Sequence, residues 1–527
     1  MITIILTGVA LSFLFWYFLV KPLHYWRDLG VKQSKPWVLF GDNWVTVFRL
    51  KSFDEMLVWL YNMYPNERYF GIYQFYLPAL LIRDPELIKQ LTVKDFDHFT
   101  DHRGFIDPES DPLWGKNLVA LKGQKWKDMR ATLSASFTSS KMKFMFHLID
   151  ETCENFVHFF DTKKEDLIEL DVKETFTRFT NDVIASAAFG IKVDSLAQPK
   201  NEFYSMGRKL TNPSGFKTIV KFIGHLIVPK LFRILGITII DSKLSKFFTQ
   251  IITETIKARE EGGIVRPDMI NLLLQARKGV KHDAGTNIDT GFATVQEFDL
   301  ETSAKPRLDL TDQDITSQAV IFFLAGFETV ATAMCFALHE LACNQDIQQK
   351  LREEITKTTS EYPKITYDGL LKMKYLDMVV SEVLRKWPPA IATDRVCTKP
   401  YTIQPVNEEE RAIHLPKGAA LFLPTFAIHR DPEYYPNPEK FDPERFSDAN
   451  KDNIKPYTYT PFGSGPRNCI GSRFALLEVK VMLYHLLLKF QVVPTAKTQI
   501  PLKMSKSFNF TAEKGFSCGI KRIGNRL

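Results

Sequence analysis

Apolar residues at three- and four-residue spacing run through most of this chain, and this periodicity limits the fold more than any other feature. Such spacing places apolar side chains on one face of an α-helix. Helices are expected over residues 53–64, 142–161, 172–189, 243–259, 313–344, 346–358, 369–387 and 473–489. Short segments with strand character are residues 69–75, 79–82, 401–403, 420–423 and the tail from 490. The sequence predicts a mainly α fold with small β-sheets.

The N-terminus carries a different pattern. Residues 2–20 contain no charged side chain, and a helix of this length comes close to the thickness of a bilayer core. A cleaved signal peptide is the alternative. It is disfavoured because no basic residue precedes the apolar run, and Trp16, Tyr17 and Phe18 stand where a cleavage site needs small residues. We therefore expect an uncleaved transmembrane signal anchor over residues 1–21.

Basic residues follow the apolar run and none precedes it: they are Lys21, Arg27, Lys32 and Lys35. The positive-inside rule then places everything after the anchor in the cytoplasm. A chain of 527 residues is long enough for two or three average domains, but large α-rich folds also reach this length as one unit. We expect a linker over residues 22–40 and a single domain over residues 41–527, with a mobile loop over residues 278–312.

Composition narrows the class of ligand. The formal net charge of +7 suits an acidic partner or an anionic membrane surface and is too small to indicate nucleic-acid binding. The 42 phenylalanines favour a cavity with aromatic walls, which suits an apolar ligand better than a sugar or a phosphate.

The six cysteines include no CxxC pair, so neither a disulfide framework nor a zinc framework is expected. This usage fits a reducing compartment. Cys335 and Cys343 lie in an apolar helical stretch, where small buried thiols are expected. His98 and His102 have the spacing of a zinc pair, but no third ligand is evident and the neighbouring aspartates favour a solvated turn.

One cysteine lies in a stiff loop, PFGSGPRNCIG, residues 461–471. Its glycines permit backbone angles that side chains forbid, and its proline fixes one φ, so the loop can present a thiolate to a ligand. Phe462, Gly465, Arg467, Cys469 and Gly471 fit the pattern FxxGxRxCxG, and here the sequence resembles the cytochrome P450 monooxygenases. The resemblance implies a P450 fold in which Cys469 is the axial ligand of haem iron and Phe462 and Arg467 help to bind the cofactor.

Two further motifs occur in the order typical of that family. Glu382 and Arg385 lie three apart, on one face of a helix, and with Arg445 they match the family's structural ionic cluster. Trp126 and Arg130 match the WxxxR element, and Arg130, Arg395 and Arg467 correspond to the arginines that bind haem propionates. Taken alone, each of these residues would be interpreted as a surface charge or a surface pair.

The segment LAGFETVAT, residues 324–332, matches the family's AGx(D/E)T motif. We expect Gly326 to let the helix pass close to a ligand, and Glu328 and Thr329 to deliver protons. The alternative is a polar interruption of a core helix. It is disfavoured because a buried glutamate is costly unless it has a function.

The resemblance is greatest to animal microsomal P450s, particularly insect enzymes of the detoxifying kind. It implies haem b, O2 as co-substrate, and electrons from NADPH through NADPH-cytochrome P450 reductase, with cytochrome b5 as a further candidate donor. It also implies a hydrophobic xenobiotic or lipid-like substrate, and a catalytic domain on the cytoplasmic side of the endoplasmic reticulum membrane. An isomerase or synthase of the same fold that needs no O2, and a non-catalytic haem-binding membrane protein, are the alternatives.

The sequence also suggests a substrate pocket, a second membrane contact and a docking face for a protein partner. Position in the family pattern places Phe322, Phe323, Ala390, Ile391 and Phe508 in the substrate pocket. Residues 216–240 mix aliphatic and basic side chains, as interfacial membrane helices do, although a core hairpin is also consistent with them. A basic docking face for the reductase, or a solvated helix face, is expected at Lys122, Lys125 and Lys127.

Overall fold

The structure is a computed structural model. It describes the chain except residues 105–108, 135–136, 212–220, 222–223, 226–227, 264–265, 267, 279–289, 299, 301–309, 508–509 and 525–527. The α-helices are α1 Ile2–Phe15, α2 Tyr25–Asp28, α3 Trp44–Val47, α4 Phe53–Tyr61, α5 Pro85–Lys89, α6 Pro112–Gly115, α7 Gly123–Ser134, α8 Ser139–Asp161, α9 Val172–Ile184, α10 Glu202–Thr211, α12 Pro229–Ile234, α13 Ser242–Gly262, α14 Met269–Arg277, α15 Asp312–Cys343, α16 Gln345–Glu361, α17 Tyr367–Leu371, α18 Lys374–Lys386, α19 Thr425–Ile428 and α20 Ser472–Lys489. The strands are β1 Tyr69–Gln74, β2 Leu77–Ile82, β3 Leu167–Asp171, β4 Thr393–Val396, β5 Tyr401–Ile403, β6 Ile413–Leu415, β7 Ala420–Leu423, β8 Phe490–Val493 and β9 Ser517–Arg522. The mainly α class with small sheets is confirmed.

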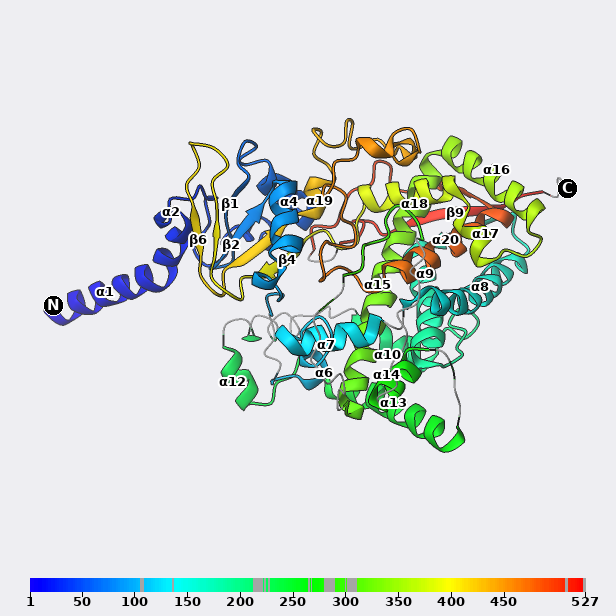
Figure 1. Cartoon of the computed structure of the whole chain (residues 1–527), viewed down its shortest axis with the longest axis horizontal. Coiled ribbons are helices and arrows are strands. Elements are labelled where there is room, and N and C mark those ends of the chain that lie inside the picture. Colours follow the sequence, from blue (N-terminus) through cyan, green and yellow to red (C-terminus); the bar gives the residue numbers. More distant parts are fainter. Residues whose placement is uncertain are drawn as a thin grey trace.

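The strands of the described residues form three small sheets. One has the order β1-β2-β7-β4, with β7 parallel to β2 and antiparallel to β4, and the others have the orders β3-β9-β8 and β5-β6. In Figure 1 the sheet that contains β1, β2 and β4 lies toward the end from which α1 projects, and the long helices fill the other side. Its pairing joins β4, which carries Arg395, to β7, so this sheet fixes one wall of the site described below.

Helix α15 crosses the centre of the helical part. Its N-terminus has a capping box, in which the side chains of Thr311 and Asp314 each bond the other's backbone N–H group. The helix packs closely on α9, where the hydroxyl of Thr180 donates to the carbonyl oxygen of Phe327 over 2.8 Å. Half or more of its residues are buried, so it is a core helix although it is long and apolar enough to span a membrane.

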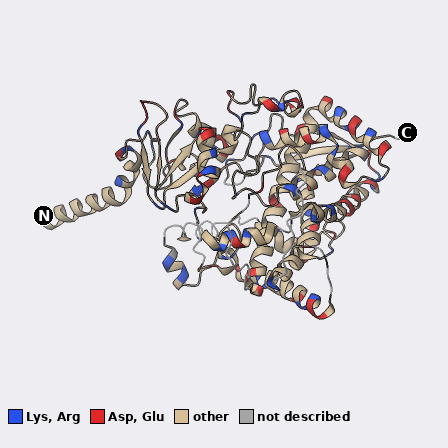
Figure 2. Ribbon diagram, in the orientation of Figure 1, with Lys and Arg blue, Asp and Glu red and all other residues tan. Residues whose placement is uncertain are grey.

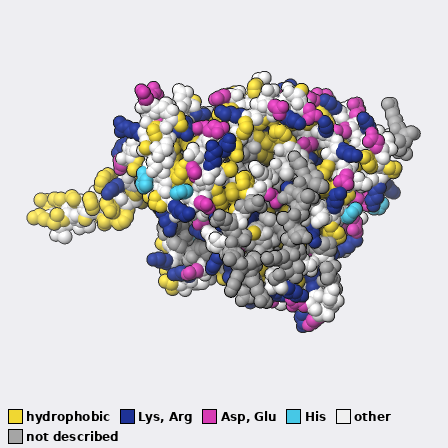
Figure 3. Space-filling model, viewed as in Figure 1, with side chains coloured by type: hydrophobic (Ala, Val, Ile, Leu, Met, Phe, Trp, Pro, Cys, Tyr) yellow, Lys and Arg dark blue, Asp and Glu magenta, His cyan; other side chains and the backbone are white. Residues whose placement is uncertain are grey.

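The N-terminal apolar helix stands away from the body. None of the residues of α1 is buried, and none is charged (Figures 2 and 3). Its length and composition make it a candidate membrane anchor. The first part of the segment predicted as a linker, residues 22–40, packs against the body of the protein. Its side chains Leu23, Trp26 and Val31 are buried in the main core.

Several local expectations need correction. Cys335 is buried as predicted, but Cys343 is exposed, because it occupies the last position of α15, where the helix leaves the core. The helix predicted over residues 369–387 is divided into α17 and α18. Most of the loop predicted over residues 278–312 lies outside the described residues, but Thr290 and Ala293 within it are buried.

Candidate active site

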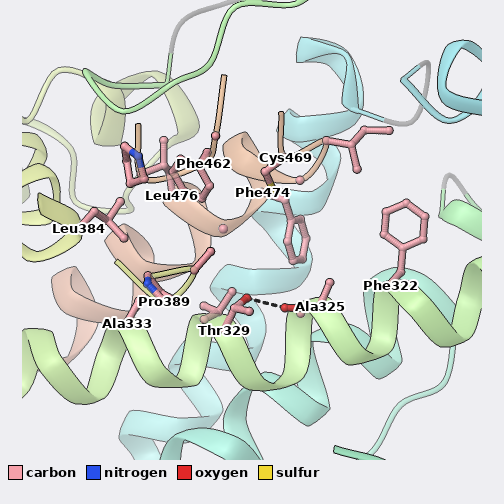
Figure 4. Close-up of a pocket in the computed structure, with 18 of the residues that line it drawn as sticks. Phe322, Ala325, Thr329, Ala333, Leu384, Pro389, Phe462, Cys469, Phe474 and Leu476 are labelled. Atoms are coloured by element: carbon pink, nitrogen blue, oxygen red, sulfur yellow. Dashed lines mark hydrogen bonds between the residues drawn. The ribbon is translucent and has the colours of Figure 1, made fainter. Parts of the chain in front are cut away.

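A cavity of about 420 Å³ lies between α15 on one side and the cysteine loop with the start of α20 on the other (Figure 4). Phe322, Ala325 and Thr329 face it from α15, and Cys469 faces it from the loop. Its other lining residues are mostly apolar, and they come from segments as distant in sequence as α8 and the residues that follow α18. The cavity therefore has few polar groups, which is the usual form of a site for an apolar ligand.

The cysteine loop has the conformation that its glycines predict. Gly465 has φ of +70°, and a Cβ at that position would lie 1.8 Å from the carbonyl oxygen of Thr92. The backbone N–H of Cys469 donates to the carbonyl oxygen of Phe462 over 2.8 Å, and that of Asn468 donates to Gly465 over 2.9 Å. These bonds close the loop on itself and fix the direction in which Cys469 points.

Cys469 lines the cavity, and its thiol lies in the interior of the protein, away from bulk solvent. Burial raises the pKa of Cys469 above its usual value, and a hydrogen bond from the backbone of Gly471 and the charge of Arg130 offset only part of this rise. The last two interactions favour a thiolate, which is the form that ligates metals. A metal at this position would add a stronger stabilisation of the same form.

Three buried arginines surround the cysteine side of the cavity. Burial lowers the pKa of Arg130 and of Arg395 to about 10 and that of Arg467 to about 9, so all three remain cations at pH 7. Arg467 donates to the carbonyl oxygens of Thr100 and Leu121 and lies 3.9 Å above the ring of Trp126. The structure thus brings together the arginines and the tryptophan that the sequence suggested.

The three arginines differ in how far protein groups satisfy them. Arg130 donates to the carbonyl oxygen and the side-chain oxygen of Asn468, both over 2.7 Å. Arg395 donates to the carbonyl oxygens of Asp394 and Ser464, but its fully buried Nε has no hydrogen-bond partner among the described residues. A buried donor without an acceptor is costly, so this atom could donate to an anionic or polar ligand.

His102 is a cavity residue that the sequence reasoning missed. Its Nδ1 lies 3.0 Å from Asp394 Oδ1, and burial lowers the pKa of the imidazole. His98, its supposed zinc partner, contacts the carbonyl oxygen of Lys399 instead. The two histidines therefore have different partners, and His102 belongs with the arginines.

The proton-delivery candidates occupy different environments. Thr329 lines the cavity, and its hydroxyl donates to the carbonyl oxygen of Ala325 in the preceding turn (Figure 4). Glu328 is not a lining residue. Its side chain is 45% exposed, and its Oε1 lies 2.5 Å from Lys173 Nζ, which also donates to the hydroxyl of Thr332 over 2.8 Å. The expectation of a buried, costly glutamate is wrong, because Glu328 is half exposed and paired with Lys173 of α9.

The glycine at position 326 is explained by helix packing as well as by the approach of a ligand. It lines the cavity, but a Cβ there would lie 2.9 Å from Ile184 Cδ1 on α9. The glycine therefore permits close packing of α15 on α9. This packing holds Lys173 near Glu328.

The ionic cluster forms as the sequence suggested. Glu382 and Arg385 are fully buried, and two nitrogens of Arg385 donate to the two oxygens of Glu382 over 2.7 and 2.9 Å. Arg445 Nε lies 3.6 Å from Glu382 Oε1. Arg385 also donates to the carbonyl oxygens of His429 and Pro438, so the cluster ties α18 to the segments that precede the cysteine loop.

The pocket expectations are only partly met. Phe322 and Ala390 line the cavity. Phe323 points away and packs in an aromatic cluster with Phe189, Phe203, Phe248 and Phe327, and Ile391 is buried in the main core. Phe508 lies outside the described residues.

Of the three lysines expected to form a docking face, two are exposed. Lys122 and Lys125 lie at the surface beside α7 and on it. Lys127 is mostly covered and its Nζ lies 2.9 Å from Asp97 Oδ1. The charge of Lys127 is therefore partly neutralised within the protein.

Comparison with known proteins agrees with this geometry. The model of the family "Cytochrome P450" matches residues 32–518. The chain belongs to the cytochrome P450 family. It is 47% identical over 517 residues to cytochrome P450 9e2 of Blattella germanica, covering 95% of this chain and 94% of the relative. It is also 42% identical over 504 residues to probable cytochrome P450 9f2 of Drosophila melanogaster, covering 93% and 94%. Membership of this P450 family supports an oxidoreductase of the monooxygenase class that uses haem iron and O2.

Proposed function

We propose that this P450 is a haem-thiolate monooxygenase that inserts one oxygen atom of O2 into hydrophobic small molecules, with electrons from NADPH supplied by a reductase. The observation that carries the proposal is Cys469, which faces Thr329 across an apolar cavity and has three buried arginines around it. A site for a cofactor with an apolar face, acidic substituents and a metal needs this combination.

The residues present fit haem b. Cys469 would ligate the iron, and Arg130, Arg395 and Arg467 would pair with the two carboxylates of haem, with Arg395 Nε as the unsatisfied donor. Trp126 and Phe462 would complete the cofactor site. Haem iron with a thiolate ligand supplies the activation of O2 when it is bound there.

The residues on α15 would manage protons. The hydroxyl of Thr329 faces the cavity, where it would accept a proton from a neighbour and pass its own to a ligand once it releases the carbonyl oxygen of Ala325. Glu328 is half exposed, so its carboxylate can exchange protons with solvent, and Lys173 fixes its direction. We infer that Glu328 feeds the hydroxyl of Thr329, and that Lys173 is a positioning residue for Glu328.

Substrate class follows from the lining. Apolar side chains such as Phe322, Val330 and Ala390 exclude water and offer few hydrogen bonds, so binding energy would come from buried apolar area. We infer xenobiotic or endogenous lipid-like substrates. The same apolar lining restricts the escape of partly reacted intermediates into water.

Location and partners complete the proposal. Residues 1–21 would anchor the protein in the endoplasmic reticulum membrane, residues 22–40 would join the anchor to the domain, and residues 41–527 would form the catalytic domain on the cytoplasmic side. Residues 216–240, of which 216–220, 222–223 and 226–227 lie outside the described residues, would give a second membrane contact. This is supported by Leu231, Ile234 and Leu235, which are 49%, 79% and 60% exposed. NADPH-cytochrome P450 reductase, with cytochrome b5 as a further donor, would dock near Lys122 and Lys125. Glu382, Arg385 and Arg445 would brace the core beside the cofactor.

The test is reconstitution of the purified protein with haem and a reductase. The ferrous protein with CO should show the red-shifted band of thiolate-ligated haem, and Cys469→Ala should lose that band or the haem itself. Absence of the band in the wild type would refute the central claim. NADPH-dependent product formation separates a monooxygenase from an isomerase of the same fold and from a non-catalytic haem protein. A difference spectrum screened over terpenoids, fatty acids, steroids and insecticides would identify the substrate class.

A further inference from the structure

Part of the long connection between α14 and α15 contacts the cysteine loop from outside the cavity. We call residues 290–297 the strap. Asn468, the neighbour of Cys469, donates from its side chain to the carbonyl oxygen of Gln296 over 2.7 Å. Arg473, in the first turn of α20, has its Nη1 2.9 Å from Glu297 Oε1. No residue of the strap lines the cavity, so among the described residues it acts on the cysteine loop only from the outer side.

The start of the strap is held by a buried ion pair. Lys480 is 2% exposed, and its Nζ donates to the carbonyl oxygen of Thr290 over 2.6 Å and to Asp377 Oδ1 over 2.8 Å. The second oxygen of Asp377 accepts the backbone N–H of Phe292 over 3.0 Å. Gly291 has φ of +143°, and a Cβ there would lie 2.0 Å from Asp377 Oδ1, so only glycine fits this contact.

An aromatic contact holds the next part of the strap. The ring of Phe292 lies 5.0 Å from that of Phe446 and 5.4 Å from that of Tyr459. Ala293 is buried in the main core. The strap is therefore packed into the protein at one end and bonded to the cysteine loop at the other, which is the arrangement of a structural support.

Glu297 also acts electrostatically on the site. Burial lowers the pKa of Arg130 to about 10, and the negative charges of Cys469 and Glu297 both oppose that change. One cation thus lies within electrostatic reach of both groups. The side chain of Glu297 is 35% exposed, so solvent screens part of its charge, whereas Arg130 and Cys469 lie in the protein interior, where charges interact more strongly than in water.

We propose that Glu297 and the strap are positioning elements for the Cys469 thiolate. The strap fixes Asn468, and through it the loop and Arg130, while the charge of Glu297 makes the addition of an electron to the iron less favourable. This inference rests on the proposed function, because it assumes haem iron on Cys469. Hydrogen bonds and net charge around the sulfur are known determinants of the potential of such sites. Glu297 therefore holds the reduction potential lower than the cysteine loop alone would set it.

The test is an equilibrium redox titration of the full-length, haem-loaded protein in detergent, followed by its absorption spectrum. Glu297→Gln removes the charge with little change of shape, and the ferric/ferrous midpoint should shift to a more positive potential. Glu297→Asp should stay close to the wild type. The matched control is Glu169→Gln, which removes an acid of β3 that pairs with Lys497 at the surface, and it should leave the midpoint unchanged.

A second variant tests whether the packing of the strap, and not only the charge of Glu297, affects the site. Phe292→Ala keeps every charge and removes the aromatic contact, so it should shift the midpoint in the same direction and expose residues 290–297 to limited proteolysis. Equal midpoints for Glu297→Gln and Glu169→Gln would overturn the inference. A shift that comes with loss of the thiolate CO band would also overturn it, because the ligand itself would have changed. If the wild type lacks that band, the proposed function fails instead.

Discussion

Replacing Arg385 by methionine tests the energetics of the ionic cluster. Methionine keeps the unbranched shape of the arginine stem but removes its hydrogen bonds to Glu382 and to the carbonyl oxygens of His429 and Pro438. Glu382 is fully buried, so its carboxylate would keep only the backbone N–H of Asp442 at 2.9 Å and the distant Nε of Arg445. Removing one partner of a buried pair costs about 3–5 kcal/mol, and we expect a loss of that size in the free energy of unfolding.

The assay is guanidinium-induced unfolding in detergent, followed by far-ultraviolet circular dichroism. Arg445→Met is the control, since Arg445 Nε lies 3.6 Å from Glu382 and makes no hydrogen bond to it. It should cost about 1 kcal/mol. Combining Arg385→Met with Glu382→Leu should cost less than the sum of the two single changes, because no unpaired charge then remains buried. A loss below about 1 kcal/mol for Arg385→Met, or strict additivity in the double variant, would show that the pair is not a coupled buried unit.

The remaining predictions concern protons and the membrane. Thr329→Ala should leave the thiolate band intact and lower product formation by up to about 10²-fold, while hydrogen peroxide rises at similar NADPH consumption; an unchanged ratio of product to peroxide would remove Thr329 from the relay. Lys173→Met should lower the ratio of product to peroxide as Glu328→Gln does, and Lys173→Arg should retain it. In a Glu328→Gln background, Lys173→Met should lower the ratio no further. A further loss in that background would mean that Lys173 acts independently of Glu328. Deletion of residues 2–20 should leave measurable binding to liposomes in co-sedimentation, through exposed apolar residues such as Leu231 and Ile234; a wholly unbound protein would refute the second membrane contact.

Local patterns allowed the long helices and the cysteine loop to be predicted. Helix α15 differs from its predicted range by one residue at each end, because helical periodicity and its capping residues are encoded nearby in the sequence. Strands β3 and β4 were missed because they are short and exist through pairing with distant segments. Contacts between residues distant in sequence also explain which parts of the site could not be predicted. Lys173 is 155 residues from Glu328, and His102 is 292 residues from Asp394.

Two neighbouring residues on α15 show that the sequence did not predict which side chains of a helix line the cavity. Phe322 lines the cavity and Phe323 packs in the core, although both belong to the same aromatic run. Periodicity indicates that a helix is buried but not which of two buried faces meets a ligand. The same reason explains Glu328, since the sequence shows an acid within an apolar helix and only the packing of α9 provides Lys173.

The contact between Trp26 and Gly71 fixes how the first helix leaves the body. A Cβ at Gly71 would lie 2.3 Å from the Trp26 ring, so the indole fills space that only glycine leaves open. Between that indole and α1 the chain is helical, passing through Trp16–Val20 and Lys21–His24. A helix turns by about 100° per residue, so one inserted residue would rotate the whole apolar arm by more than a quarter turn about its axis. If α1 is embedded in lipid, the ten residues between α1 and Trp26 would therefore affect the height and tilt of the cavity above the bilayer.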